Sequence, residues 1–311
     1  MANIVWMQTG ACSGESMALL CADRPSIENL IDQYGLNFLW HPSLTADRSF
    51  GEVLDGVTSG REPLDILCIE GSLLTGPNGS GQYDTWKGRA KIDIVRQLAP
   101  LATHVVAMGT CAAYGGVHAA GPNPTDCTGL QFMKDQPGGL LGSDWRSRNG
   151  QPVINVAGCP AHPNTMTKVL AMLAEGETLS LDALNRPAAF FSTLVHQGCT
   201  RNEYHEYDIE DNVLGGRGCL FFNLGCRGPQ TVAPCNTELW NGHNSKTRAG
   251  VPCFGCTSAD FPPARDLFVT PKIGTVPKFL PLGVARAKYM AYKNLARAAA
   301  PERVVNREME P

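Results

Sequence analysis

Short apolar segments, most of them rich in β-branched residues, recur along the first half of the chain. Such segments are typical of strands buried on both faces of a sheet. Helical patterns lie between and after them, at residues 86–98 and 164–175. Because strands that alternate with helices favour a parallel sheet with helices on its faces, we expect an α/β domain over residues 1–180. Its expected strands are residues 3–7, 37–40, 64–69, 104–108 and 153–156.

The pattern changes after Glu177. Regular periodicity fades, and glycine, proline and asparagine become dense. Six of the twelve cysteines lie between Cys199 and Cys256. Metal binding can supply folding free energy to a segment that has few regular elements of its own. We therefore expect a second domain over residues 181–311, ordered around inorganic centres.

The last part of this region, residues 283–299, has helical spacing again, with Lys288, Lys293 and Arg297 among its polar positions. We expect a solvated face over an apolar stripe. A helix that lies on a membrane surface is the alternative.

Charge and composition exclude some classes of function. The net charge of −3 leaves no basic stripe for nucleic acid, and no apolar run of about 18 residues predicts a membrane span. The opening MANIVWMQTG reads as a strand rather than a leader. We expect a cytoplasmic chain, in solution or peripheral to the cytoplasmic membrane. In that reducing compartment many cysteines favour metal binding or catalysis over disulfides.

Three cysteines of the first half share a setting. Cys12, Cys111 and Cys159 each follow a predicted strand, in glycine-containing loops that read TGACSGES, MGTCAAYGG and VAGCPAHP. Loops after parallel strands meet at the carboxyl edge of the sheet, so we expect these thiols to converge. Cys68 and Cys21 fit buried structural positions in a strand and a helix, because cysteine is often a small buried hydrophobe. Cys127 is expected to be a loop thiol with no role.

The second half carries His196 and Cys199 in the spacing HxxC, followed by three more cysteines and the pair in VPCFGC. A zinc ribbon needs two tight pairs, and only one is present. A thioredoxin-like disulfide needs a strand before the pair and a helix after it, and a proline-flanked loop late in the chain does not offer that. Iron-sulfur clusters accept irregular thiolate spacing and an occasional histidine. A zinc-stabilised interaction protein is the alternative from another class.

The motifs GTCAAYGG, GCPAHP, HQGC, CLFFNLGCRGP and PCFGC, in this order, closely resemble the small, electron-transferring subunit of nickel-iron hydrogenases. The resemblance implies a flavodoxin-like first domain, three iron-sulfur clusters, and a large subunit as partner that carries the NiFe centre. It implies a proximal cluster on Cys12, Cys111 and Cys159, a medial 3Fe-4S cluster on Cys235, Cys253 and Cys256, and a distal cluster on His196, Cys199, Cys219 and Cys226.

Two departures from the family pattern bear on the clusters. Glu15 stands where the family has a second proximal cysteine, which leaves the proximal cluster as 3Fe-4S or as 4Fe-4S completed by Glu15. Cys219 and Cys226 are one residue further apart than is usual, so the distal cluster is left as 3Fe-4S or 4Fe-4S.

Together with the opening strand, this resemblance implies a leaderless uptake hydrogenase that passes electrons to a quinone or a redox protein. The sequence leaves open whether the complex forms a higher oligomer. No residue of this chain is expected to be catalytic. Glu70 follows a strand at the same sheet edge, where it either joins a proton or hydrogen-bond relay or caps a helix. The rival within electron transfer is the cluster-bearing chain of complex I-like quinone reductases, which lacks the cysteine-rich second half.

Overall fold

The computed structural model describes residues 1–308. By its internal contacts the chain divides into two compact units, residues 1–190 with 256–262 and residues 191–255 with 263–311. The first unit extends beyond the boundary predicted after residue 180, and it takes in a short loop from late in the chain.

A five-stranded parallel sheet forms the centre of the first unit, in the order β11-β7-β3-β1-β2. All five predicted strands are confirmed. The three central strands are apolar on both faces, since helices cover both, and their residues from Ile4 to Met7 and from Ile66 to Ile69 are almost fully buried. The strands are β1 (Ala2–Gln8), β2 (Leu36–Trp40), β3 (Leu64–Glu70), β7 (Ala102–Met108) and β11 (Ile154–Val156).

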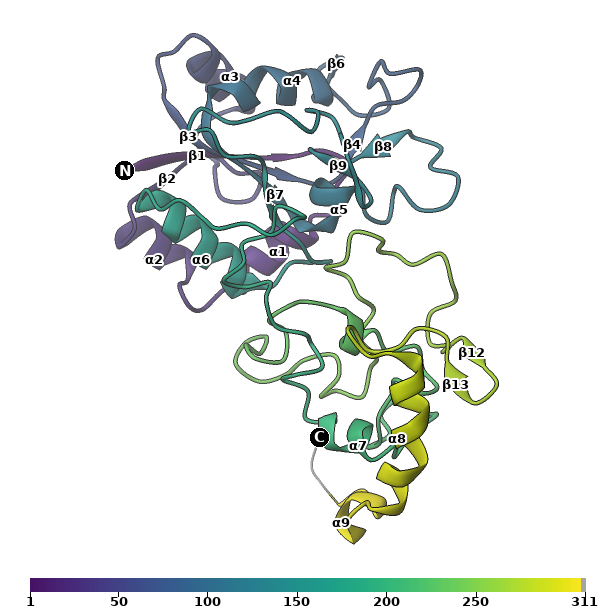
Figure 1. Cartoon of the computed structure of the whole chain (residues 1–311). Helices are drawn as coiled ribbons and strands as arrows, with labels where there is room; N and C mark the ends of the chain where they lie inside the picture. Colours follow the sequence, from purple (N-terminus) through teal and green to yellow (C-terminus); the bar gives the residue numbers. More distant parts are fainter. Residues whose placement is uncertain (309–311) are drawn as a thin grey trace. The chain divides into compact units, whose positions relative to one another are not determined.

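Two groups of helices cover the sheet, α3 and α4 on one face and α1, α2 and α6 on the other (Figure 1). Serine begins two of them: Ser26 and Ser49 each accept a backbone N–H in a capping box, which satisfies a donor at the helix start. The α-helices of this unit are α1 (Gly14–Leu20), α2 (Ile27–Asp32), α3 (Phe50–Thr58), α4 (Lys91–Leu98), α5 (Gly109–Tyr114) and α6 (Pro163–Ala174).

The helix predicted at residues 164–175 is confirmed as α6, but the one predicted at 86–98 starts later. Residues 85–90 form a two-stranded hairpin instead, because Lys87 and Gly88 both take positive φ angles, 49° and 78°, which a helix does not allow. The remaining short elements are η1 (Ala99–Leu101), β4 (Leu73–Leu74), β5 (Thr85–Trp86), β6 (Arg89–Ala90), β8 (Cys127–Thr128), β9 (Phe132–Met133) and β10 (Gln136–Pro137).

The structure corrects the expected settings of two cysteines. Cys21 is exposed at the end of α1 rather than buried, because it lies past the last turn that packs on the sheet. Cys127 is not a loop thiol: it lies in β8 with 1% of its surface exposed, and Asn123 bonds both its N–H and its carbonyl. Cys68 is fully buried in β3, as predicted.

The second unit has little regular structure, as predicted. Its main apolar cluster consists of Tyr204, Ile209, Cys219, Phe221, Phe222 and Val304. Its elements are α7 (Asn202–Glu206), η2 (Gly228–Gln230), the hairpin of β12 (Lys272–Ile273) and β13 (Val276–Pro277), α8 (Arg286–Ala298) and α9 (Glu302–Val305).

The helix expected at residues 283–299 forms as α8, but the expected buried stripe does not. No residue of α8 is buried, and Tyr292 and Leu295 are each 67% exposed. Its polar face is paired, because Lys293 lies 3.7 Å from Asp208 and Arg297 lies 3.9 Å from Glu210. Over residues 1–308, no helix combines the length and the apolar character needed to span a bilayer.

Candidate functional site

Cys12 and Cys159 lie in the loops that follow β1 and β11, as the sequence predicts, whereas Cys111 lies in α5, the helix that begins directly after β7, and not in a loop. Thr110 joins α5 to the loop of Cys159: its N–H donates to the Gly158 carbonyl at 2.7 Å, and its hydroxyl accepts from the Gly158 N–H at 2.9 Å. These two hydrogen bonds hold the start of α5 and the loop after β11 together at the carboxyl edge of the sheet.

Glu15 points into the same place from the first turn of α1. Its carboxylate accepts the Ala161 N–H at 2.7 Å and lies against Gly109, whose φ of 84° and absent side chain leave room for it. Glu15 is only 8% exposed. Burial raises its pKa to about 8, and the charge of Glu70 acts in the same direction. The carboxylate thus lies between α5, which carries Cys111, and the loop that carries Cys159.

The thiols of this edge are close enough to influence one another. Burial raises the pKa of Cys111 to about 11 and that of Cys159 to about 12. Neighbouring Cys12, Glu15 and, for Cys159, Cys256 add to this effect. Metal ligation requires the thiolate form. A cationic core is the partner that would stabilise several anions gathered here, so the donor set fits an iron-sulfur cluster.

Glu70 ends β3 at this edge and is 1% exposed. One carboxylate oxygen accepts the backbone N–H groups of Glu15 and Ser16, at 3.1 and 3.3 Å. The other accepts the indole N–H of Trp6 at 2.9 Å, the Gln8 amide at 3.1 Å and the Ser16 hydroxyl at 2.6 Å. Glu70 therefore anchors the start of α1, and through it the position of Glu15.

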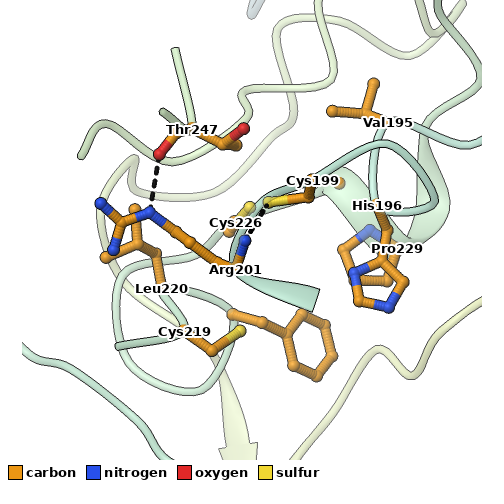
Figure 2. A pocket seen from close by; sticks show the side chains of 11 residues that line it. Val195, His196, Cys199, Arg201, Cys219, Leu220, Cys226, Pro229 and Thr247 are labelled. Atoms are coloured by element: carbon orange, nitrogen blue, oxygen red, sulfur yellow. Dashed lines mark hydrogen bonds between the residues drawn. The ribbon is translucent and has the colours of Figure 1, made fainter. Parts of the chain in front are cut away.

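In the second unit, one cavity is lined by all four predicted distal ligands, His196, Cys199, Cys219 and Cys226. Figure 2 shows their side chains around it. The HxxC spacing places His196 and Cys199 on one tight turn, where the Cys199 N–H donates to the His196 carbonyl. The CLFFNLGC segment returns to supply the other two thiols. The structure thus brings together residues up to thirty positions apart in the sequence.

Backbone amides point at the sulfurs of this cavity. The Arg201 N–H lies 3.4 Å from the Cys199 Sγ, and the Cys253 N–H lies 3.3 Å from the Cys226 Sγ. Burial raises the pKa of Cys226 to about 11 and raises that of Cys219 as well. Amide N–H groups that face sulfur are the usual outer partners of cluster thiolates, so this site also fits an iron-sulfur core.

Arg201 lines the same cavity and was not anticipated from the sequence. It is 3% exposed, and its guanidinium donates to the carbonyls of Thr247 at 2.7 Å and of Gly218 at 2.8 Å, and also to that of Gly216. Within residues 1–308 no carboxylate pairs with it. Its charge lowers the pKa values of Cys219 and Cys226 against the effect of burial. A buried cation beside several thiols suits an anionic centre.

The predicted medial ligands fall in different units. Cys253 forms a small apolar cluster with Val195 and Ala233, and Cys235 packs against that cluster in the second unit. Cys256 belongs to the first unit, where its carbonyl accepts the Thr110 hydroxyl at 2.5 Å. The shared role of these three cysteines stays a prediction.

A site for a single metal ion differs from a cluster site in how close together its ligands lie. In the part of the chain that the structure describes, no three His, Cys, Asp or Glu side chains converge in a way that could hold one metal ion. In a cluster, each protein ligand binds a different iron, so its ligands lie further apart.

A larger cavity, of about 460 Å³, has one of the predicted distal ligands, His196, in its lining. Its volume is in the range that holds small-molecule ligands. The lining is largely apolar or aromatic, and His196 and His205 both contribute to it. Residues Leu194, Phe222, Pro281, Leu282, Val284, Tyr289 and Tyr292 form most of the rest.

Two family models match the chain. Residues 12–173 match the NADH ubiquinone oxidoreductase 20 kDa subunit, and residues 191–269 match the C-terminal region of the NiFe/NiFeSe hydrogenase small subunit. The second match covers the cysteine-rich half, which separates this chain from its quinone-reductase rival.

Relatives agree over most of the chain. The small subunit of the F420 non-reducing hydrogenase II of Methanosarcina mazei is 32% identical over 86% of this chain and 75% of its own length. The periplasmic NiFe hydrogenase small subunit 1 of Nitratidesulfovibrio vulgaris is 31% identical over 83% and 79%. A solved actinobacterial-type NiFe-hydrogenase from Ralstonia eutropha H16 matches with a TM-score of 0.78 and 28% identity, over 100% of this chain and 92% of that one. The fold and the cysteine sites define an iron-sulfur electron-transfer protein. The chain belongs to the family of NiFe hydrogenase small subunits.

Proposed function

We propose that this chain is the electron-relay subunit of an uptake NiFe hydrogenase, whose large subunit oxidises hydrogen while this chain carries the electrons to an acceptor. The observation that carries the proposal is the cavity lined by His196, Cys199, Cys219 and Cys226, with buried Arg201 beside it. When bound, iron-sulfur clusters accept and release single electrons. The chain's own residues hold them, shield them from water and set the local charge.

For the proximal site we propose a 3Fe-4S cluster, or a 4Fe-4S cluster completed by Glu15. A carboxylate is a harder donor than a thiolate and matches iron in a sulfide core less well. Fewer thiolates also place less negative charge on the cluster, which raises its reduction potential and favours uptake over hydrogen evolution. The burial of Glu15 between α5, which carries Cys111, and the loop of Cys159 supports this assignment.

The test is Glu15→Cys in the assembled complex. We expect a changed electron paramagnetic resonance signal, a lower proximal potential and a smaller ratio of hydrogen oxidation to evolution. If the signal, the potential and the ratio all stay as in the wild type, Glu15 takes no part in the proximal site.

For the acceptor we propose a quinone whose head group enters the 460 Å³ cavity. An apolar, partly aromatic lining suits a flat, apolar ring, and His196, a predicted cluster ligand, borders the same space. A short distance between cluster and acceptor is what electron exit requires. The proposal includes a cytoplasmic location, in solution or peripheral to the cytoplasmic membrane, and its support is the cysteine usage of the chain.

The test compares two variants of α8 in the purified complex with the large subunit. Ala296 lines the cavity, whereas Ala291 is exposed on the same helix and does not. We expect Ala296→Trp to raise the KM for a short-chain quinone at least tenfold, with hydrogen-dependent reduction of a soluble dye unchanged, and Ala291→Trp to change neither. An equal KM for the quinone in both variants would show that the cavity is not the acceptor site. A complex without iron, or without dye reduction, would refute the relay function itself.

A further inference from the structure

A second histidine lies next to the predicted distal ligands. His205, in the short helix α7, stands with its ring centroid 4.4 Å from that of His196. Its ring is stacked on Phe222 at 5.4 Å and meets Phe221 edge-on at 5.0 Å. These contacts hold the imidazole in one orientation, since a ring packed on three sides cannot turn freely.

One ring nitrogen of His205 faces a predicted cluster ligand. Nδ1 lies 3.5 Å from the Sγ of Cys219, which is within hydrogen-bond reach for sulfur. A metal-bound thiolate can only accept a hydrogen bond, so Nδ1 must carry the proton.

We propose that His205 is a positioning residue of the distal site, whose Nδ1–H donates a hydrogen bond to the Cys219 thiolate and raises the reduction potential of the cluster bound there. The inference rests on the proposed function, because only a ligating Cys219 is a thiolate at neutral pH. It gives His205 a chemical role that the HxxC motif does not contain.

Packing alone does not account for His205. A half-buried imidazole among aromatic rings has a cost unless its polar atoms find partners, and a phenylalanine at this place would pack on Phe222 without that cost. The only side-chain hydrogen bond that His205 makes within residues 1–308 is the one to Cys219. His205 also lines the 460 Å³ cavity, so it lies between the cluster ligand and the proposed acceptor site.

The expected direction of the change in reduction potential follows from charge. A hydrogen bond to a cluster sulfur withdraws electron density from it and stabilises the reduced state, which carries one more negative charge. Loss of the donor should therefore make the distal cluster harder to reduce. A tenfold change in the equilibrium constant of a one-electron couple corresponds to about 59 mV.

The test uses two variants of nearly equal shape in the complex with the large subunit. His205→Asn keeps an N–H donor near the place of Nδ1, whereas His205→Leu has none, and both lose the ring to the same extent. The measurement is a redox titration of the distal cluster followed by electron paramagnetic resonance. We expect the Leu variant to lie at least 59 mV, a tenfold change, below the Asn variant, and the Asn variant to stay close to the wild type.

Exposed His243 provides the matched control, since His243→Leu should leave the potential unchanged. Equal potentials in the Asn and Leu variants would overturn the role of His205, even if the complex still reduces quinone. A wild-type complex that shows no distal cluster signal would overturn the proposed function and this inference with it. Quinone reduction lost in both variants at unchanged potential would also count against the hydrogen bond, and would leave a role in the acceptor cavity alone.

Discussion

Replacing Glu70 with Gln tests how the proximal edge is built. The carboxylate accepts five hydrogen bonds, two on one oxygen and three on the other. Glutamine has the same shape, but one of its terminal atoms is an NH₂ group and cannot accept. In its better orientation the amide oxygen keeps the three side-chain donors, and the NH₂ then faces the backbone N–H groups of Glu15 and Ser16.

The expected loss of stability follows from those two backbone donors. A buried donor left without an acceptor costs about 1–3 kcal/mol, so the loss is roughly 2–6 kcal/mol at the start of α1. Every 1.4 kcal/mol is a factor of about ten in an equilibrium constant, so local opening of α1 should become at least about tenfold more frequent. Because Glu15 lies in the first turn of α1, the proximal site should loosen with it.

Hydrogen exchange of the assembled complex, followed by mass spectrometry, measures this opening. We expect a peptide that spans α1 to lose at least tenfold in protection in Glu70→Gln, while a peptide that spans α3 keeps its protection. Glu177→Gln, at an exposed position, is the control and should change neither peptide. Unchanged protection of α1 in Glu70→Gln would show that the five hydrogen bonds do not hold this helix.

Three further predictions concern burial and ligation. Burial lowers the pKa of His41 to about 4, so below about pH 6.5 the unfolded chain binds a proton that the folded chain does not. The free energy of unfolding should therefore fall as the pH drops from 6.5 towards 4. In urea titrations, His41→Gln should make this free energy depend less on pH. Cys253→Ser should lower the iron content and the melting temperature of the complex, whereas Cys21→Ser, at an exposed position, should change neither. Equal iron contents in the two variants would contradict the assignment of Cys253 as a ligand. Arg201→Met should destabilise the second unit by roughly 2–6 kcal/mol, because the buried carbonyls of Thr247 and Gly218 lose their donor, as does the half-buried carbonyl of Gly216. A stability in urea equal to that of the wild type would show that this cation is dispensable.

The sequence by itself determined the sheet and the strands after which Cys12, Cys111 and Cys159 lie. Runs such as LDILCIE predict a strand buried on both faces because they are apolar throughout. Cys12, Cys111 and Cys159 follow such strands, so their convergence depends only on the rule that parallel strands end at one edge. Each of these signals is contained in a short stretch of chain, which is why reading along the sequence finds it.

Only the tertiary structure decided what surrounds those cysteines. Nothing in the sequence near Arg201 or His205 shows that the first is buried without a carboxylate partner, or that the second packs on His196 and reaches Cys219. Five hydrogen bonds to Glu70 likewise come from residues more than fifty positions away. Burial and hydrogen bonding depend on distances between segments that the chain brings together only on folding, so no local pattern contains them.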